Sequence, residues 1–351
     1  MTMKTWRVAL VMIARDEAAN VVRALASARN HVDELVVLDT GSTDATVELA
    51  RAAGARVGRF AWRDDFAAAR NAALELADAD WNVVVDADEW IRDGGPALLE
   101  LRHTPPGFVG LLRVDSHFDM PAGIATAPSW LPRVLPRGVR YDGCIHEQPV
   151  HALPARRLQV VLDHEGYRAA ALEAKAGRNG RLLAQALRRA PDDAYLHYQA
   201  GKDHDVYERY ADAAQAFARS RECEAAADAG RIRSWHHDRL VREIHALKRC
   251  GRHEDAVQLA EGEMARWPES PDFFFALGDL LLDWATEQPE RAGELLPMIE
   301  SAWLRCLEIG ERPDLEGAVA GRGSVLAASN LAVLYEGTGR ADDAARMRAG
   351  G

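Results

Sequence analysis

The sequence has few cysteines and no excess of positive charge. Its four cysteines stand far apart without a Cys-x-x-Cys pair, which excludes a zinc cluster or a disulfide scaffold and predicts a cytoplasmic, reducing environment. Lys and Arg number 43 against 54 Asp and Glu, so the net charge is −11 and no basic stripe forms. We therefore expect no nucleic-acid partner.

Long hydrophobic runs are also missing. The apolar run at residues 8–13 is too short to span a bilayer and lacks a small-residue cleavage site, and no later run reaches ~18 residues. We therefore expect no transmembrane segment. The composition, with 48% hydrophobic and 28% charged residues, excludes wholesale disorder, and 351 residues suit two domains.

The first half of the chain alternates short apolar runs with helical patterns. Predicted strands cover residues 8–13, 35–38, 55–57 and 81–85. Predicted helices cover residues 18–28, 42–54 and 66–77. Ser42 or Thr43 is the expected N-cap of the second helix. This alternation predicts an α/β fold with a mainly parallel, Rossmann-like sheet.

A proline-rich region follows residue 94, where apolar runs at 108–114, 131–135 and 159–162 predict strands that finish the sheet. From residue 169 onward only helical patterns occur. Small residues recur twelve apart, as in Gly201 to Ala213, which resembles degenerate tetratricopeptide (TPR) repeats with an insertion around residues 286–298. We expect an α/β domain at 1–168 and an all-α repeat domain at 169–351, with a generic helical bundle as the alternative to repeats.

Asp86-Ala87-Asp88 directly follows the fourth predicted strand, and Asp39 follows the second. Ligands in parallel sheets bind at the carboxyl ends of the strands. Two carboxylates one residue apart can face one cation, and hard oxygen ligands suit Mg²⁺ or Mn²⁺. Such a cation would neutralise a diphosphate leaving group. The alternative is a solvated turn that caps the next helix.

The segments LDTGSTDAT, DDFAAARN and DADE, in this order, resemble family-2 glycosyltransferases of the GT-A fold over residues 7–90, and more weakly to 167. With its repeats, the chain resembles a subgroup that includes the peptide S-glycosyltransferases of the bacteriocin (glycocin) type. The segment YDGCIHE is similar to one in lipopolysaccharide-core transferases. The resemblance implies metal-dependent, inverting transfer from a nucleotide-diphosphate sugar, a UDP-hexose, to a peptide or protein side chain. A glycan or lipopolysaccharide-type acceptor is the alternative.

The resemblance also implies which residues hold the nucleotide. Ile13 and Ala14 would contact the base or ribose through backbone atoms, and Glu17 would lie near the nucleotide or cap the following helix. Asp39 would bind the uracil or ribose, with a plain helix cap as its alternative. Arg70 would reach the nucleotide or its diphosphate, with a surface salt bridge as the alternative.

The remaining donor residues lie in and beyond the Asp-x-Asp segment. By the resemblance, Asp86 and Ala87 would contact the ribose or the donor sugar, and Asp88 would bind Mn²⁺ or Mg²⁺. His164 would supply a further metal ligand, or alternatively be a buried histidine with satisfied hydrogen bonds. Glu89 would support the metal shell or favour a helix N-terminus.

Acceptor residues are expected later in the chain. Glu147 is the candidate general base, with His146 assisting, and a salt bridge to a nearby arginine is the alternative for Glu147. Asp115 is the second candidate base, and Trp130 is a candidate acceptor contact. The repeats would bind the acceptor, form a homodimer, or both.

Two other functions compete with this prediction. A sugar nucleotidyltransferase would need a glycine-rich first loop, which ARDEAAN lacks. A non-catalytic repeat scaffold with a vestigial first domain would have no physical reason to keep two carboxylates at one strand end.

Overall fold

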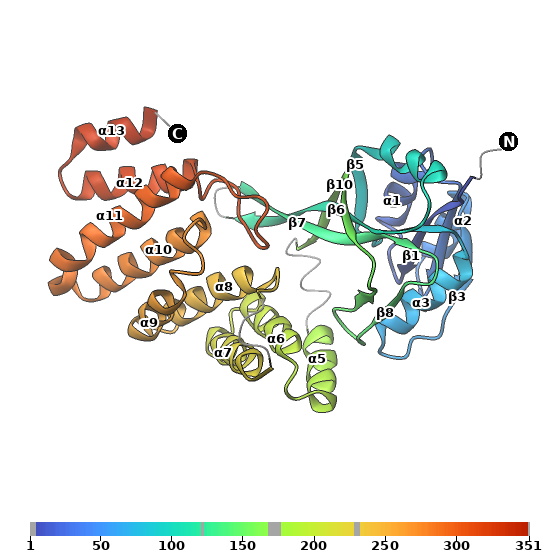
Figure 1. Ribbon diagram of the computed structural model, residues 1–351, viewed down its shortest axis with the longest axis horizontal. Helices are drawn as coiled ribbons and strands as arrows, with labels where there is room; N and C mark the ends of the chain where they lie inside the picture. Colours follow the sequence, from blue (N-terminus) through green and yellow to red (C-terminus); the bar gives the residue numbers. More distant parts are fainter. Residues whose placement is uncertain (1–4, 121–122, 168–176, 228–231, 350–351) are drawn as a thin grey trace. The chain divides into compact units, whose positions relative to one another are not determined.

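The computed structural model describes residues 5–120, 123–167, 177–227 and 232–349. It divides into two compact units, Met1–Leu182 and Leu183–Gly351, shown in Figure 1. The boundary predicted between residues 168 and 169 lies outside the described residues. The predicted fold class, an α/β unit followed by a helical unit, is confirmed.

One large mixed sheet organises the first unit. Its strands are β1 (Val8–Ala14), β2 (Glu34–Asp39), β3 (Arg56–Arg59), β4 (Trp81–Val84), β5 (Glu89–Asp93), β6 (Val109–Met120), β7 (Gly123–Pro136) and β10 (Ala155–Tyr167). Their order across the sheet is β3-β2-β1-β4-β7-β6-β10-β5, in which β1 to β4 are parallel while β7 and β5 run against their neighbours. A separate hairpin pairs β8 (Arg140–Asp142) with β9 (Gln148–Val150).

Helices cover both faces of this sheet. α1 (Val21–Ala28), α2 (Thr46–Ala52) and the 3-10 helix η1 (Gly95–His103) share a buried core with one set of β1 side chains, including Leu10. α3 (Phe66–Ala77) packs on the opposite set, including Val11. Strand residues buried on both faces explain the continuous apolar runs in the sequence.

The N-cap predicted for the second helix is wrong. α2 begins at Thr46, and its cap position, Ala45, makes no side-chain hydrogen bond. The Ser42 hydroxyl instead accepts a hydrogen bond from the Asp16 backbone N–H at 3.0 Å. Ser42 is therefore used to join two loops rather than to start the helix.

Helices stacked in pairs form the second unit. They are α6 (Ala194–Val206), α7 (Tyr210–Ala227), α8 (His236–Arg249), α9 (His253–Glu263), α10 (Pro271–Glu287), α11 (Ala292–Ile309), α12 (Val325–Gly337) and α13 (Ala341–Ala349); α5 (Arg178–Arg189) crosses the division between the units. Within each pair the helices pack on each other, and α7 contacts α8, α9 contacts α10 and α11 contacts α12. Ala213 and Ala256 are fully buried where paired helices meet. The TPR-like arrangement is thus confirmed.

The insertion into the repeats predicted around residues 286–298 stays a prediction. Those residues form the end of α10, the 3-10 helix η2 (Pro289–Arg291) and the start of α11. A further irregular segment lies between α11 and α12, where the Asp272 side chain accepts hydrogen bonds from the Val319 N–H at 2.9 Å and from Arg322 at 3.0 Å.

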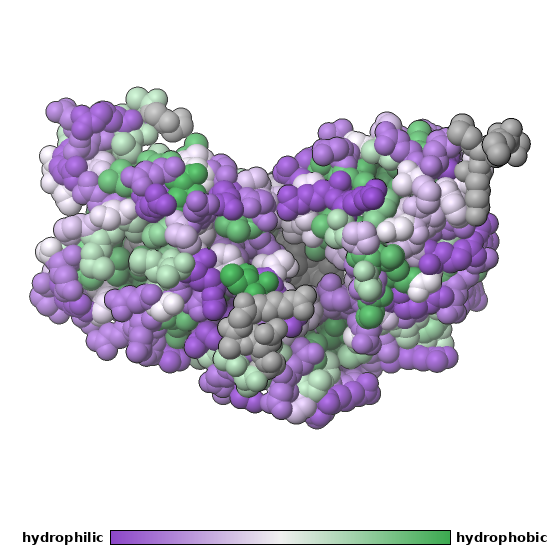
Figure 2. All heavy atoms as spheres, viewed as in Figure 1, coloured by the Kyte–Doolittle hydropathy of each residue, from purple (hydrophilic) through white to green (hydrophobic). Residues whose placement is uncertain are grey.

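The visible face of the helical unit in Figure 2 mixes hydrophilic residues with smaller hydrophobic areas. Its exposed large hydrophobic side chains are Ile232, Met264, Met298, Val325, Leu326 and Val333. None of the helices in the described ranges combines the length and apolar character that a membrane span requires.

Candidate active site

The sheet order places a topological switch point between β1 and β4. From β1 the chain steps outward to β2 and β3, and it then returns to the other side of β1 as β4. β1 pairs with β2 as far as Ala14 opposite Asp39, but with β4 only as far as Val11 opposite Val84. Open α/β sheets bind ligands at this kind of position, outside the carboxyl ends of the strands.

Backbone and side-chain hydrogen bonds join the loops that follow β1 and β2. The Thr43 N–H donates to Asp16 at 2.7 Å, the Glu17 N–H donates to the Thr46 hydroxyl at 2.7 Å, and the Ala18 N–H donates to Asp44 at 3.0 Å. Asp16 has a positive φ of 55°, a strained backbone position that the surrounding hydrogen bonds hold. The two loops therefore form one fixed edge beside the switch point.

Ile13 and Ala14 lie at the end of β1, as predicted. Ile13 is half-buried and Ala14 is buried. The Ala14 carbonyl already accepts hydrogen bonds from the Thr40 N–H at 2.9 Å and the Thr40 hydroxyl at 3.2 Å. If a nucleotide donates to the Ala14 carbonyl, as predicted, it must therefore compete with Thr40 for that oxygen.

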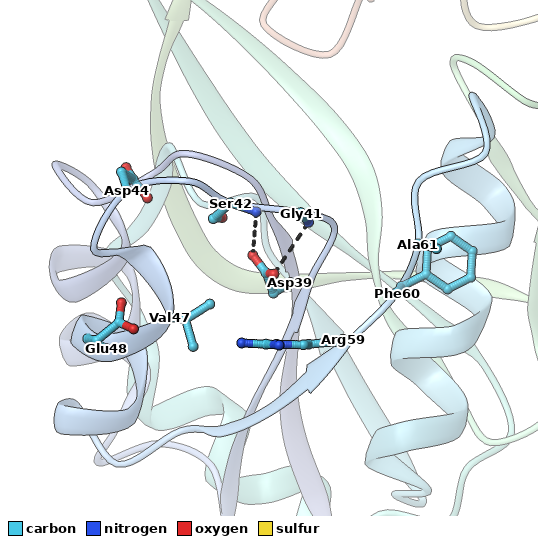
Figure 3. Close-up of a pocket in the computed structure, with 9 residues that line it drawn as sticks. All are labelled: Asp39, Gly41, Ser42, Asp44, Val47, Glu48, Arg59, Phe60 and Ala61. Carbon is cyan, nitrogen blue, oxygen red and sulfur yellow. Dashed lines mark hydrogen bonds between the residues drawn. The ribbon is translucent and has the colours of Figure 1, made fainter.

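Asp39 lines a cavity of about 400 Å³ at the end of β2 (Figure 3). Its carboxylate accepts backbone hydrogen bonds from Gly41 at 3.3 Å and Ser42 at 3.0 Å. The other lining residues are Asp44, Val47, Glu48, Arg59, Phe60 and Ala61. A carboxylate has about four acceptor sites, so Asp39 keeps capacity for a ligand N–H or O–H, and the volume falls in the range of small-molecule pockets.

Two arginines hold Asp86, the first residue of the Asp-x-Asp turn. Arg70 Nη2 lies 2.7 Å from Asp86 Oδ1, and Arg133 Nη2 lies 2.9 Å from Asp86 Oδ2. Burial alone would raise the pKa of Asp86, but the charges of Arg70 and Arg133 outweigh it and hold that pKa well below its usual range. Asp86 is therefore a fixed, ionised acceptor.

Arg70 also connects this turn to the YDGCIHE segment, because its Nε donates to Glu147. The arginine is 9% exposed, so its surface-salt-bridge alternative is wrong. The alternative prediction for Glu147, a salt bridge to a nearby arginine, is confirmed because its carboxylate pairs with Arg70. Its role as general base stays a prediction.

Helix α3 holds the YDGCIHE segment against the site. The Asn71 amide donates to the Tyr141 carbonyl at 2.9 Å and accepts from the Tyr141 N–H at 2.8 Å. The Phe66 N–H donates to the Cys144 carbonyl at 2.9 Å. His146 has a positive φ of 50°, so the backbone beside Glu147 is strained, as is common at functional sites.

Asp88 and His164 face each other across the sheet edge, with 3.6 Å between Asp88 Oδ2 and His164 Nε2. Antiparallel pairing of β10 with β5 puts His164 opposite Glu89, which explains how residues so distant in sequence meet. His164 Nδ1 lies 3.2 Å from the Ser116 hydroxyl. Burial lowers the pKa of His164, but Asp88 outweighs it, and the pKa is raised.

The donor set fits a cation that is only partly held by protein. Within the described ranges no group of three His, Cys, Asp or Glu side chains is placed to hold a metal. Mg²⁺ commonly binds through one or two carboxylates and completes its shell with substrate phosphates and water. Asp88 and His164 match that incomplete shell. The prediction that they bind a metal stays a prediction.

The two acceptor candidates on β6 and β7 have different surroundings. Asp115 is 2% exposed, and its oxygens accept from Arg113 at 2.6 Å and Arg92 at 2.8 Å. Its role as the second candidate base stays a prediction. Trp130 is half-buried, and the Arg157 guanidinium lies 4.7 Å from its ring.

Two residues of the site were not predicted. Arg133 is 8% exposed, and Tyr141 is 7% exposed with burial raising its pKa to about 12 against the lowering effect of Arg70 and Arg133. The signal for Arg133 is a charged residue inside the apolar segment LPRVLP, since an arginine within a buried strand needs a carboxylate partner.

Residues 9–117 match the family model described as Glycosyl transferase family 2. The chain thus carries a family-2 glycosyltransferase domain, joined to TPR-like helical repeats.

The curated relatives include a TPR repeat-containing protein of Synechococcus elongatus, 54% identical over 83 residues (24% of this chain, 21% of the relative). Another is the SPbeta prophage-derived glycosyltransferase SunS of Bacillus subtilis, 24% identical over 201 residues (55% of this chain, 48% of the relative). An uncharacterized glycosyltransferase of Rickettsia felis is 37% identical over 83 residues (24% and 29%). The chain spans less than half the length of each of these relatives.

Among solved structures, MamA of Desulfovibrio magneticus is 15% identical, with 51% of this chain and 82% of that chain covered and a TM-score of 0.37. Glucosyl-3-phosphoglycerate synthase of Mycobacterium tuberculosis, solved with Mn²⁺, UDP and glucosyl-3-phosphoglycerate, is 28% identical, with 32% and 44% covered and a TM-score of 0.26.

Proposed function

We propose that this protein transfers a hexose from a UDP-sugar to a side chain of a peptide or protein with inversion at the anomeric carbon. The observation that carries the proposal is that the Asp86–Asp88 turn follows β4 at the switch point, across β1 from Asp39 at the end of β2. The family-2 match over residues 9–117 supports a sugar-transfer reaction at this edge of the sheet.

In this proposal the donor lies along the carboxyl ends of β1, β2 and β4. Asp39 accepts a hydrogen bond from the uracil or ribose, beside the backbone of Ile13, Ala14 and Glu17. Asp86, with its neighbour Ala87, binds a ribose or sugar hydroxyl while Arg70 fixes the Asp86 carboxylate and lies toward the diphosphate. When bound through Asp88 and His164, Mn²⁺ or Mg²⁺ would neutralise charge on the departing diphosphate.

The reaction is a single displacement. The acceptor atom forms a bond to the anomeric carbon as the bond to the UDP oxygen breaks, and the acceptor proton passes to Glu147, with His146 beside it. A thiol acceptor would need less help from a base than a hydroxyl, because it ionises more readily.

The acceptor is a peptide or protein in this proposal, because the chain resembles peptide S-glycosyltransferases and carries repeats of a kind that binds partners along one surface. Trp130 would contact the acceptor, and the repeats would bind it, form a homodimer, or both. The dispersed cysteines support a cytoplasmic location in this proposal.

A donor screen tests the proposal. We expect one UDP-hexose, incubated with Mn²⁺ and candidate peptides or glycans, to release UDP and yield a product of inverted anomeric configuration by NMR. Asp88→Ala should abolish transfer in a protein whose circular dichroism is unchanged. Transfer at the wild-type rate by folded Asp88→Ala would contradict the proposal, and transfer only to glycans would replace the peptide acceptor with a saccharide.

A further inference from the structure

Arg133 joins the two ends of the turn that carries Asp88. It lies on β7, the strand next to β4, and is 8% exposed. Its Nη2 donates to Asp86 Oδ2 at 2.9 Å and also donates to Glu89. One guanidinium nitrogen thus bridges the carboxylates on either side of Asp88.

The bridged turn is closed by its own backbone as well. The Asp86 N–H donates to Glu89 Oε2 at 3.1 Å, and the Glu89 N–H donates to the Asp86 carbonyl at 3.0 Å. Asp88 lies inside this loop, so the direction of its side chain depends on how Asp86 and Glu89 are held.

Charge makes the bridge necessary for that geometry. Asp86 and Glu89 are both acidic, and Glu89 is only 1% exposed, so their repulsion is weakly screened. Asp86 also contacts a second arginine, Arg70, at 2.7 Å. Among the described residues, Arg133 is the arginine that pairs with Glu89. Without Arg133 the buried Glu89 carboxylate would lose its cationic partner and the turn would relax away from Asp86.

We propose that Arg133 is a positioning residue for the metal–diphosphate end of the donor: it holds Asp86 and Glu89 together and so fixes the turn from which Asp88 reaches the cation. This inference rests on the proposed function. Partners that orient a metal ligand in this way commonly change metal affinity by about 10- to 100-fold when they are removed.

The test is the Mn²⁺ concentration that gives half-maximal UDP binding to the full-length protein, measured by calorimetry. We expect Arg133→Met to raise it about tenfold or more, and to lower the thermal midpoint because the buried Glu89 carboxylate loses its cation; UDP affinity without metal should fall less than the Mn²⁺ requirement rises. Arg133→Lys keeps a cation that can donate to both carboxylates, so it should lie between wild type and Arg133→Met.

Arg137→Met is the matched control. Arg137 follows β7 directly and pairs with Asp78 and Asp80, but it is 52% exposed. Because exposed pairs contribute little, its Mn²⁺ requirement should equal that of wild type.

A second variant covers the case in which Arg133→Met does not fold. Arg133→Met/Glu89→Gln removes the arginine together with the buried carboxylate, so it should fold yet keep the raised Mn²⁺ requirement. A folded Arg133→Met, or this double variant, with a wild-type requirement would overturn the inference alone. Wild-type protein without Mn²⁺-dependent UDP binding would instead overturn the proposed function.

Discussion

Asp86 and Asp88 are two residues apart in sequence but have different surroundings. Asp86 has both oxygens on arginines, while Asp88 faces the imidazole of His164 at 3.6 Å. A carboxylate already held by two cations has less to gain from a metal ion, whereas one beside a single imidazole can share a cation with that ring once the ring has lost its proton. The environment therefore favours a sugar or ribose hydroxyl at Asp86 and the cation at Asp88.

The sequence indicated which carboxylates stand at strand ends, because strand endings follow from apolar runs. It did not indicate that Arg133 pairs with Asp86, 47 residues away, or that Arg70 pairs with Glu147 across 77 residues. Such partners depend on which strands become neighbours in the sheet, and no local pattern encodes that. The same reason explains why Asp115, predicted as an acceptor-side base, is buried between two arginines.

A buried ion cluster in the helical unit gives a pH prediction. Asp238 on α8 accepts from the Tyr198 hydroxyl at 2.6 Å and from Arg242 Nε at 2.9 Å, and Lys202 lies 3.8 Å away. Burial raises the pKa of Asp238, but Arg242 and Lys202 outweigh it and lower the pKa to about 2.

Because this folded-state pKa is below the ordinary value of 3.8, the ionised Asp238 stabilises the fold above about pH 4. That contribution, about 2 kcal/mol at pH 7, should be lost as the pH falls from 4 toward 2. Asp238→Asn should lower the free energy of unfolding at pH 7 by this amount and remove its share of the pH dependence, as measured by urea unfolding of the helical unit.

Asp192→Asn is the control for this prediction. Asp192 also pairs with an arginine, Arg219 at 2.7 Å, but its side chain is 78% exposed, so little change is expected. Equal stability of Asp238→Asn and wild type at pH 7 would contradict the account of the cluster.

At the scale of elements, strand β7 shows what the local pattern missed. The sequence predicted a strand at residues 131–135, and the observed strand spans Gly123–Pro136 despite Pro128 and Pro132. β4 lies along one side of β7 and pairs with it only at residues 134–136. On that side of β7, Pro128 and Pro132 therefore have no partner among the strands that the structure describes. Both prolines lie opposite β6 residues, but a strand tolerates proline more readily where it has a neighbour on one side only, and the sequence could not reveal that without the strand order.

Close contact between helices α10 and α11 gives a second stability prediction. A Cβ at Gly278 would overlap the Trp303 indole, and Trp303 is 1% exposed and has little room to move. Gly278→Ala should therefore destabilise the helical unit by about 1–3 kcal/mol, measured by urea unfolding.

Gly262 on α9 provides the matched control for this prediction. A Cβ there would meet nothing within 4 Å, so Gly262→Ala should be neutral or stabilise by up to ~1 kcal/mol through helix propensity. If both variants behaved alike, the close packing of these repeats would be contradicted.

At the scale of the whole molecule, the first half of the chain alternates strands and helices, and the second half has helices alone. This change was predictable because strands and helices differ in the spacing of their apolar residues. The repeats followed from small residues at a fixed spacing, which pack at helix contacts and so recur in the sequence. The long segment between α11 and α12 was not predicted, since its contacts to Asp272 are distant in sequence.

The central claim is that the switch-point edge binds a UDP-sugar through a metal at Asp88. Calorimetric titration of UDP, GDP and CMP, with and without Mn²⁺, on wild type and Asp88→Ala tests it most directly. The account predicts UDP binding that is strengthened by Mn²⁺ in wild type and loses that strengthening in Asp88→Ala. Folded wild-type protein that binds none of the three nucleotides, or Asp88→Ala that keeps the full Mn²⁺ effect, would contradict it.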